Sequence, residues 1–208
     1  MGNLVSLEGR IYAHRGCWNS DVLQNSLASF NIAIENRFSI ETDVRKRDGR
    51  LVISHDSPHP DVSFELSCLT QMTSTFALNL KEDGLQEDIT RKREWMEATN
   101  SFVFDGSIPE MYRYHKLGIR HALRISEFEK TLPWKSCALW LDSFYEDWWI
   151  NDSSVERLME NTNTIVVSPE LHGRDARFVW DALAAKHANG YSNFSICTDM
   201  PSEFLAWL

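Results

Sequence analysis

The sequence has little of what marks disordered, membrane-spanning or disulfide-rich chains. Six prolines and nine glycines in 208 residues, with no biased tract, argue against long disordered segments. No apolar run approaches the roughly 18–20 residues that a membrane-spanning helix needs, and no signal-peptide pattern opens the chain. The four cysteines are scattered without a CxxC pair, so we expect reduced thiols and a cytoplasmic protein.

Positive charge is also scarce. The chain has 21 lysines and arginines against 30 aspartates and glutamates, which gives a formal net charge of −9. Nucleic acids and anionic membranes attract positive surfaces, so we expect neither nucleic acid nor stable membrane insertion, although a local basic pocket is compatible with this balance. Gly2 and Ser6 fit the loose N-myristoylation pattern, but no polybasic segment follows them. The sequence does not indicate the oligomeric state.

The chain does contain a regular alternation of strand-like and helix-like segments. Hydrophobic residues make up 43% of it, which is enough for one domain with a sizeable core. Eight strands alternating with helices predict a parallel sheet, and that number favours an α/β fold of the compact TIM-type (β/α)8 barrel class, with a single domain over residues 1–208. A doubly wound open sheet is the alternative. The expected strands lie at 11–14, 39–44, 76–80, 101–105, 119–124, 138–142, 164–168 and 194–198.

Helix and turn signals fill the intervals. An apolar spacing over residues 27–34 predicts a helix behind Asn25 as its N-cap. Gly49 predicts a hairpin turn before a short strand at 51–54. Further helices are expected from Pro109 and over residues 153–161 and 174–188.

A charged residue or a histidine stands near the C-terminal end of each expected strand. In a barrel these ends form one rim, where active sites are built from residues far apart in the sequence. Side chains two apart share a strand face, so Glu41 and Asp43 are expected to point together into the barrel mouth, while Ile40, Thr42 and Val44 face the helices. The rim residues are His14, Asp43, Lys81, Asp105, Arg124, Asp142, Glu170 and Asp199.

The densest group of reactive side chains lies in the first quarter of the chain. Glu41 and Asp43 are two hard oxygen ligands on one strand, which suits Mg²⁺ or Ca²⁺ better than zinc. His14 and His55 can share general acid and general base duties, and Arg15 matches phosphate oxygens. Phosphodiester cleavage needs this combination of charge neutralisation and proton transfer. Taken singly, each group is equally well explained as a paired surface carboxylate or a hydrogen-bonded histidine.

These motifs resemble the glycerophosphodiester phosphodiesterase family. The resemblance implies a barrel, a divalent metal ion and hydrolysis of a phosphodiester, with His14 and His55 as the acid–base pair. By the same match Glu41 and Asp43 would hold the metal, while Arg15 and Lys81 would face the phosphate. The matching segments are AHRG at 13–16, QNSLASF at 24–30, ETDV at 41–44 and DGRLVISHD at 48–56, and more weakly LNLK at 78–81 and CTDMP at 197–201.

The sequence departs from the family pattern at three places. Asn79 stands where the family usually has a glutamate that is a third metal ligand, so we expect weaker metal binding, with Asp105 as a candidate to compensate. Gln24 replaces the usual glutamate before the asparagine of its motif. The usual substrate-covering insertion is missing, because only about twenty residues separate Asp56 from the third strand. We expect these residues, from Ser57 to Ser67 and including an exposed His59, to form a loop over the rim.

Fewer signals bear on the substrate. Arg124 is expected to add positive charge near the phosphate, and Asp142 and Glu170 are candidates to bind substrate hydroxyls, with a helix cap or rim salt bridge as the alternative for the two acids. Without a covering insertion the site is expected to be open, which suits a phosphodiester attached to a glycan or other polymer. We expect the tryptophans 148, 149 and 180 to pack between helices and barrel.

Several functions remain open at this point. The leading hypothesis is a metal-dependent phosphodiester hydrolase acting on a glycerophosphodiester-like or glycan-linked substrate. Asn79 motivates a catalytically inactive phosphate- or sugar-binding barrel as the alternative. A phospholipase D-type lyase that forms a cyclic phosphate would use the same residues, and a barrel isomerase or lyase acting on a carbonyl compound is disfavoured because it seldom needs two histidines and an arginine together.

Overall fold

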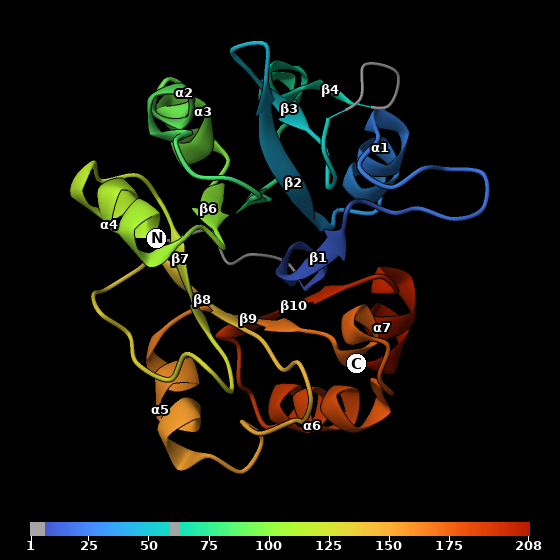
Figure 1. Ribbon diagram of the computed structural model, residues 1–208. Coiled ribbons are helices and arrows are strands. Elements are labelled where there is room, and N and C mark those ends of the chain that lie inside the picture. The colour runs from blue at the N-terminus through green and yellow to red at the C-terminus, as the bar shows by residue number, and fades with distance from the viewer. Residues whose placement is uncertain (1–6, 59–62) are drawn as a thin grey trace.

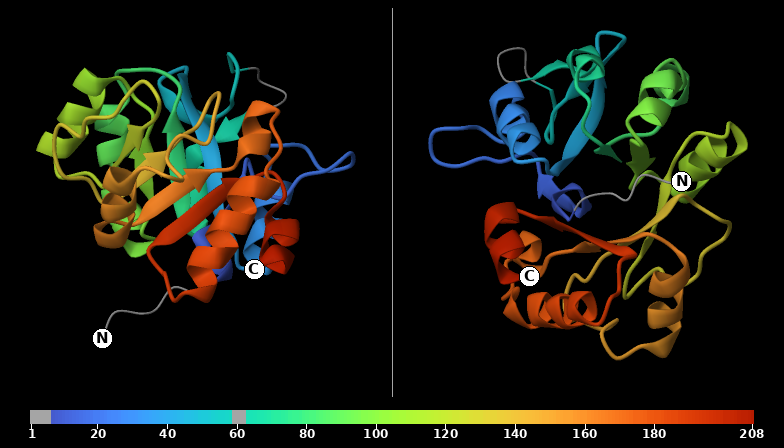
Figure 2. Two further views of the ribbon diagram at one scale, coloured as in Figure 1. Left: turned by 90° about the horizontal axis from the view of Figure 1, so that it is seen from below. Right: turned by 180° about the vertical axis from the view of Figure 1, so that it is seen from behind.

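The computed structural model describes residues 7–58 and 63–208, and its strands form a ring with the helices outside it (Figures 1 and 2). The strands are β1 (Ile11–His14), β2 (Ser39–Arg47), β3 (Arg50–Ile53), β4 (Phe64–Glu65), β5 (Phe76–Leu80), β6 (Phe102–Phe104), β7 (Ala122–Ile125), β8 (Ala138–Leu141), β9 (Thr164–Val167) and β10 (Phe194–Thr198). The α-helices are α1 (Leu27–Glu35), α2 (Gln86–Thr90), α3 (Arg93–Ala98), α4 (Ile108–Lys116), α5 (Ser153–Asn161), α6 (Arg177–Ala188) and α7 (Pro201–Trp207). Three 3-10 helices are η1 (Glu8–Arg10), η2 (Leu66–Gln71) and η3 (Pro169–His172).

The pairing of the strands confirms the TIM-type barrel. The parallel strands follow the order β6, β5, β2, β1, β10, β9, β8, β7, so the first and last strands of the chain lie side by side. That pairing rules out the doubly wound alternative. The two ends of the sheet, β6 and β7, meet at one parallel bridge between Val103 and His121, where the Val103 amide donates to the Arg120 carbonyl at 3.1 Å. All eight strands expected from the sequence are present, with ends shifted by up to three residues.

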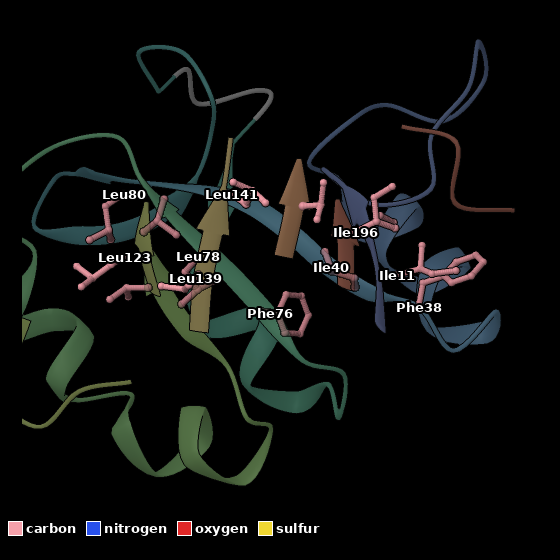
Figure 3. Close-up of a cluster of buried hydrophobic side chains, with 14 of the residues drawn as sticks. Ile11, Phe38, Ile40, Phe76, Leu78, Leu80, Leu123, Leu139, Leu141 and Ile196 are labelled. Atoms are coloured by element: carbon pink, nitrogen blue, oxygen red, sulfur yellow. The ribbon is translucent and has the colours of Figure 1, made fainter. Parts of the chain in front are cut away.

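The alternation of side chains along the strands divides the core into two layers. The layer between sheet and helices contains Ile40, Phe76, Leu78 and Leu139, among others (Figure 3). The barrel interior is filled by the residues one position away on the same strands: Tyr12, Ala77, Phe102, Phe104, Ala122, Ala138, Trp140, Ile165, Val167 and Cys197. Since Ile40 and Val44 lie in the outer layer, Glu41 and Asp43 face the interior, as expected. Trp149 and Trp180 are buried in the outer layer, which confirms their packing role.

The structure confirms the predicted hairpin turn but places the N-cap of α1 at a different residue. Asp48 and Gly49 adopt φ values of 49° and 76°, the type I′ conformation that joins twisted antiparallel strands, so the hairpin between β2 and β3 is confirmed. The N-cap of α1, in contrast, is Ser26 and not Asn25. The Ser26 hydroxyl accepts from the Ser29 amide while the Ser29 hydroxyl accepts from the Ser26 amide, and Asn25, at φ 51°, uses its side chain elsewhere.

The connection from β3 to β5 is more ordered than the expected loop over Ser57–Ser67. Phe64 and Glu65 form β4, which pairs with β3 in antiparallel fashion, and η2 follows directly. His59, and the acylation signal at Gly2 and Ser6, lie outside the described residues. The four cysteines are free thiols, as expected. In the part of the chain that the structure describes, no helix is long and apolar enough to cross a membrane.

Candidate active site

The candidate site lies at the mouth of the barrel, at the C-terminal ends of β1, β2, β5 and β10. Glu41 and Asp43 point inward from β2, and the parallel register sets Asp43 beside Asn79 of β5. Lys81 follows on the same face of β5, two residues beyond Asn79. The sheet therefore brings together two acidic residues, an amide and an ammonium group that are up to forty residues apart in the sequence.

Asp43 is the most heavily contacted of these groups. Its Oδ2 accepts from Asn25 Nδ2 at 2.8 Å and lies 3.1 Å from Arg15 Nε, while Oδ1 lies 3.1 Å from Lys81 Nζ. Thr42, on the other face of β2, donates from its hydroxyl to Asn25 Oδ1 at 2.7 Å. This bond orients the side-chain amide of Asn25 toward Asp43. Burial alone would raise the pKa of Asp43, but Lys81, Asn25 and Arg15 together hold it below its ordinary value. Asp43 is thus an ionised, buried carboxylate.

Glu41 has a contrasting environment. Its side chain is buried, the amide of Arg15 donates to Oε2 at 3.3 Å, and His14 Nε2 lies 3.8 Å from the same oxygen. Burial and the nearby charge of Asp43 raise the pKa of Glu41, and the cations around it offset this only in part. The two neighbouring carboxylates therefore differ in pKa: that of Asp43 is lowered and that of Glu41 is raised.

His14 is oriented by its contact with β10. Its Nδ1 lies 2.8 Å from Asp199 Oδ1, which also accepts from Trp18 Nε1 at 3.2 Å. Burial works to lower the pKa of His14, yet the hydrogen bond to Asp199 and the charges of Glu41 and Asp199 raise it overall. Because an ionised carboxylate only accepts, Nδ1 of His14 carries a proton and Nε2 is the nitrogen left facing Glu41.

The turn after β1 positions Arg15. Arg15 has a φ of 56° and Gly16 a φ of 84°, so the chain turns sharply and packs against α1. A Cβ atom at Gly16 would lie 2.8 Å from the carbonyl carbon of Ser29, which leaves room for glycine alone. Arg15 NH1 donates to Gln24 Oε1 at 2.9 Å. Gln24 therefore helps to hold the guanidinium of Arg15 in place.

His55 stands apart from this cluster. Its side chain is 44% exposed, its Nδ1 lies 3.0 Å from Asp56 Oδ1, and its carbonyl accepts from Arg45 Nε at 2.9 Å. It lines a cavity of about 730 Å³ together with Arg15, Asn25 and Phe64. His55 and Arg15 thus border one open space at the rim, and His14 stands next to Arg15 in the chain.

Side chains at the mouth offer the kind of oxygen donors that a divalent metal ion takes. Asn79 is buried, with 8% of its surface exposed, and its Oδ1 has no hydrogen-bond partner in the described part of the chain. Two carboxylates and an amide oxygen are donors that hard cations prefer. Within residues 7–58 and 63–208, no group of three or more His, Cys, Asp or Glu side chains is arranged to hold a metal. Among these residues Asp105 does not form such a group with Glu41 and Asp43, and its compensation for Asn79 stays a prediction.

Asp105 is instead engaged by a cation. Arg124 NH1 contacts Asp105 and Arg124 Nε contacts Glu129, so two carboxylates hold the guanidinium that the sequence suggested for phosphate. Burial raises the pKa of Asp105, and Arg124 offsets part of this effect. The sequence around Asp105 and Arg124 does not indicate that these residues pair.

The opposite side of the mouth contains a pair that sequence reasoning missed. His172 Nε2 lies 2.7 Å from Asp142 Oδ1, and the His172 ring is 4.9 Å from the Phe144 ring between centroids. Glu170 accepts from the hydroxyls of Ser168 and Thr198 and, at 3.3 Å, from the amide of Asp199. His172 stands two residues after Glu170 in the 3-10 helix η3, and this short spacing is the signal that the sequence offered.

Two solved structures share the fold of this chain. A crystal structure of a glycerophosphodiester phosphodiesterase from Agrobacterium tumefaciens str. C58 matches with a TM-score of 0.68 and 15% identity, covering 94% of this chain and 98% of that one. A protein described as a glycerophosphoryl diester phosphodiesterase from Silicibacter pomeroyi DSS-3 matches with a TM-score of 0.64 and 10% identity, covering 95% and 92%. These identities are low, so the two likenesses show the fold. No curated protein matches the sequence.

The barrel and the matched family define a phosphoric diester hydrolase. The chain matches the Glycerophosphoryl diester phosphodiesterase family over residues 14–199, nearly its whole length, and it belongs to that family. Members of the family hydrolyse glycerophosphodiesters and generally use a divalent metal ion.

Proposed function

We propose that the chain is a metal-dependent phosphodiester hydrolase that uses His14 and His55 as its acid–base pair. The observation that carries the proposal is the cluster around β2. Asp43 has Arg15 Nε and Lys81 Nζ each at 3.1 Å, and Glu41 has the imidazole of His14 at 3.8 Å. Acidic oxygens, cations and an oriented imidazole within one buried cluster suit the cleavage of an anionic diester.

Glu41, Asp43 and Asn79 are the residues that we assign to a divalent cation, Mg²⁺ or Ca²⁺. All three offer oxygen atoms, and the buried Asn79 Oδ1 lacks another partner among the described residues. When bound, such an ion polarises a phosphoryl oxygen and neutralises charge in the transition state. Asn79 contributes an oxygen but no charge, so the affinity should be lower than with a third carboxylate.

Arg15 and Lys81 are the proposed phosphate ligands. Arg15 is fixed through Nε by Asp43 and through NH1 by Gln24, which leaves NH2 without a hydrogen bond among the described residues. A guanidinium fixed in this way can donate to a phosphate oxygen without first losing much conformational freedom. Lys81 Nζ, which contacts Asp43 Oδ1, adds a second positive charge on the same side.

The two imidazoles share the proton transfers. His14 donates through Nδ1 to Asp199, so its Nε2, 3.8 Å from Glu41 Oε2, is the nitrogen that accepts or gives a proton at the mouth. His55 has its Nδ1 beside Asp56, its Nε2 makes no hydrogen bond with the described residues, and its side chain lines the 730 Å³ cavity. One of them removes a proton from an attacking water, and the other protonates the leaving alkoxide.

The substrate class is a glycerophosphodiester-like or glycan-linked phosphodiester. The rim opposite His55 combines the His172–Asp142 pair with the exposed rings of Phe128 and Tyr145, at 70% and 75% exposure. Aromatic rings beside fixed hydrogen-bonding groups suit a hydroxylated alcohol. In the proposed substrate-binding set Asp142 contacts hydroxyls, with Glu170 beside it and with Arg124 as a cation whose guanidinium also pairs with Asp105 and Glu129.

Hydrolysis of a glycerophosphodiester followed by ³¹P NMR tests this function. We expect a phosphomonoester to accumulate with Mg²⁺ or Ca²⁺ present, and EDTA to stop the reaction until the metal is restored. A cyclic phosphate as the first product would instead identify a lyase, in which a neighbouring substrate hydroxyl attacks. Turnover that EDTA leaves unchanged would contradict the metal assignment.

An inactive phosphate- or sugar-binding barrel is the second candidate. The ion pair between Lys81 and Asp43 and the uncharged Asn79 favour it, because both reduce the negative charge available to a cation. Saturable binding of a phosphodiester without release of any alcohol, in the presence of either metal, would support this candidate over the hydrolase.

A further inference from the structure

A second cavity, of about 620 Å³, lies at the end of the barrel opposite the candidate active site. Its lining residues stand at the starts of strands: Arg10 precedes β1, Arg120 precedes β7 and Asn163 precedes β9. In TIM barrels the chemistry takes place at the C-terminal ends of the strands. A ligand in this cavity is therefore separate from the substrate of the reaction.

The charge of this cavity is opposite to that of the protein. The chain as a whole has a formal net charge of −9, yet the residues that line the cavity include Arg10 and Arg120 and no aspartate or glutamate among the described part of the chain. Side-chain amides and hydroxyls, among them Asn163 and Ser195, make up much of the remaining wall. A local positive pocket on an acidic protein attracts anions and not cations.

Arg120 is the residue that points most directly to a ligand. It is half-buried, its Nε is fully buried without a hydrogen-bond partner, and its guanidinium forms no ion pair within the described residues. A buried donor without a partner is costly, and native structures usually satisfy it with a ligand, an ion or water. No carboxylate in the described structure accepts a hydrogen bond from Arg120.

The backbone holds Arg120 in a fixed position. Its carbonyl accepts from the Val103 amide at 3.1 Å, at the seam where β6 meets β7, and the next residue, His121, bridges to Val103. The His121 carbonyl in turn accepts from the Cys137 amide at 3.0 Å. These bonds fix the backbone from which the Arg120 side chain reaches the cavity.

The base of the cavity is apolar. Tyr12 and Phe102 both line it, and their rings meet edge to face with centroids 6.1 Å apart. A cavity of this volume is within the range of about 300–1,000 Å³ that small-molecule sites occupy, and larger than a bare inorganic anion requires. Cationic walls above an aromatic base suit a small organic molecule with an anionic group.

We propose that this cavity binds a small phosphate-bearing molecule, with Arg120 as its main ligand and Arg10 as a second cation. The planar guanidinium matches the geometry of phosphate oxygens, and two guanidinium groups suit a doubly charged anion. The site does not depend on the reaction proposed for the opposite end of the barrel.

Calorimetric titration of the metal-loaded protein with glycerol 3-phosphate tests the site. The wild-type protein is expected to bind at two sites, one at each end, and Arg120→Met to lose one of them, with at least a tenfold weaker affinity there. Arg15→Met is expected to weaken only the other. Retention of both sites in Arg120→Met, or a single site in the wild type that Arg120→Met leaves unchanged, would overturn the proposal.

Two further experiments distinguish loss of binding from a folding defect and identify the part of the ligand that is recognised. Asn163→Asp adds a negative charge to the cavity wall and should also abolish binding there, whereas Asn151→Asp, the same change at an exposed position outside the cavity, should not. Equal effects of both substitutions would contradict the site. Inorganic phosphate in place of glycerol 3-phosphate should bind through the same Arg120, and the ratio of the two affinities measures how far the carbon skeleton is recognised.

Discussion

The Nδ1 atom of His14 and the Oδ1 atom of Asp199 are 2.8 Å apart, a hydrogen bond between the last residue of β1 and the residue that follows β10. It exists because β1 and β10, which are far apart in the chain, pair in parallel when the sheet closes on itself. The hydrogen bond fixes which nitrogen of His14 carries a proton and leaves Nε2 toward Glu41. In the proposed mechanism this contact sets the orientation of the acid–base group.

Asp199→Asn is therefore expected to lower kcat/KM about 100-fold, because an amide can orient the imidazole with the wrong nitrogen protonated. The change keeps the size of the side chain, so the free energy of unfolding should alter little. Steady-state kinetics with a glycerophosphodiester measures the effect. Asp181→Asn, which makes the same change at an exposed residue that accepts from the Trp207 indole, is the matched control and should keep full activity. Equal activities of the two variants would remove Asp199 from the mechanism.

Asn79→Asp should strengthen metal binding at least tenfold. The substitution adds a negative charge beside Asp43 while keeping an oxygen in place, and the affinity of a hard cation increases with the number of charged ligands. Titration of activity with Mg²⁺ and direct calorimetry both report the affinity. Asn151→Asp makes the same change at an exposed position and should leave it unchanged. An unaltered affinity in Asn79→Asp would place the metal elsewhere.

Gly16→Ala is expected to destabilise the protein by about 2 kcal/mol, because it combines backbone strain at φ 84° with a clash against Ser29. Gly84 has a similar φ of 90°, but a Cβ atom there would have no neighbour within 4 Å among the described residues, so Gly84→Ala should cost only about 1 kcal/mol. Urea denaturation measures both. Equal losses would show that strain alone, and not the close packing of the turn, requires glycine at position 16.

The protein is expected to become less stable as the pH falls, because the folded state keeps His121 neutral. Burial lowers the pKa of His121, and the ring accepts from Trp134 Nε1 at 2.9 Å, so the folded state holds it neutral. The unfolded chain binds the proton more readily, so stability is full above the unfolded pKa of about 6.5 and is lost as the pH falls through the folded value.

His121→Gln keeps an acceptor for Trp134 but cannot titrate, so its free energy of unfolding should change less between pH 7.5 and 5 than that of the wild type. Chemical denaturation at several pH values provides the measurement. His187→Gln, a change in α6 outside this cluster, should retain the wild-type pH dependence. A His121→Gln profile parallel to the wild type would contradict the assignment.

The strands could be predicted from the sequence because their side chains alternate so regularly. Phe76 and Leu78 face the helices while Ala77 and Asn79 face inward, and the same period of two placed Glu41 and Asp43 at the mouth. Helix ends were less predictable, because Ser26 and Asn25 are both good caps and only the contact of Asn25 with Asp43 decides between them.

Pairings across the barrel could not be predicted in the same way. Arg124 and Asp105, which the sequence assigned to phosphate and metal, also contact each other, and the sequence did not indicate this pairing. The partner of Asp142 proved to be His172, thirty residues away. Such contacts depend on loop conformations between strands, and no local pattern encodes them.

The most direct test of the account is the initial rate of glycerophosphodiester hydrolysis by the wild type, His14→Ala and His55→Ala at saturating Mg²⁺. We predict that each substitution lowers kcat at least 100-fold while the metal affinity changes less than threefold, because both histidines transfer protons and neither holds the ion. Wild-type rates in His14→Ala or in His55→Ala would contradict the assignment of these two histidines as the acid–base pair.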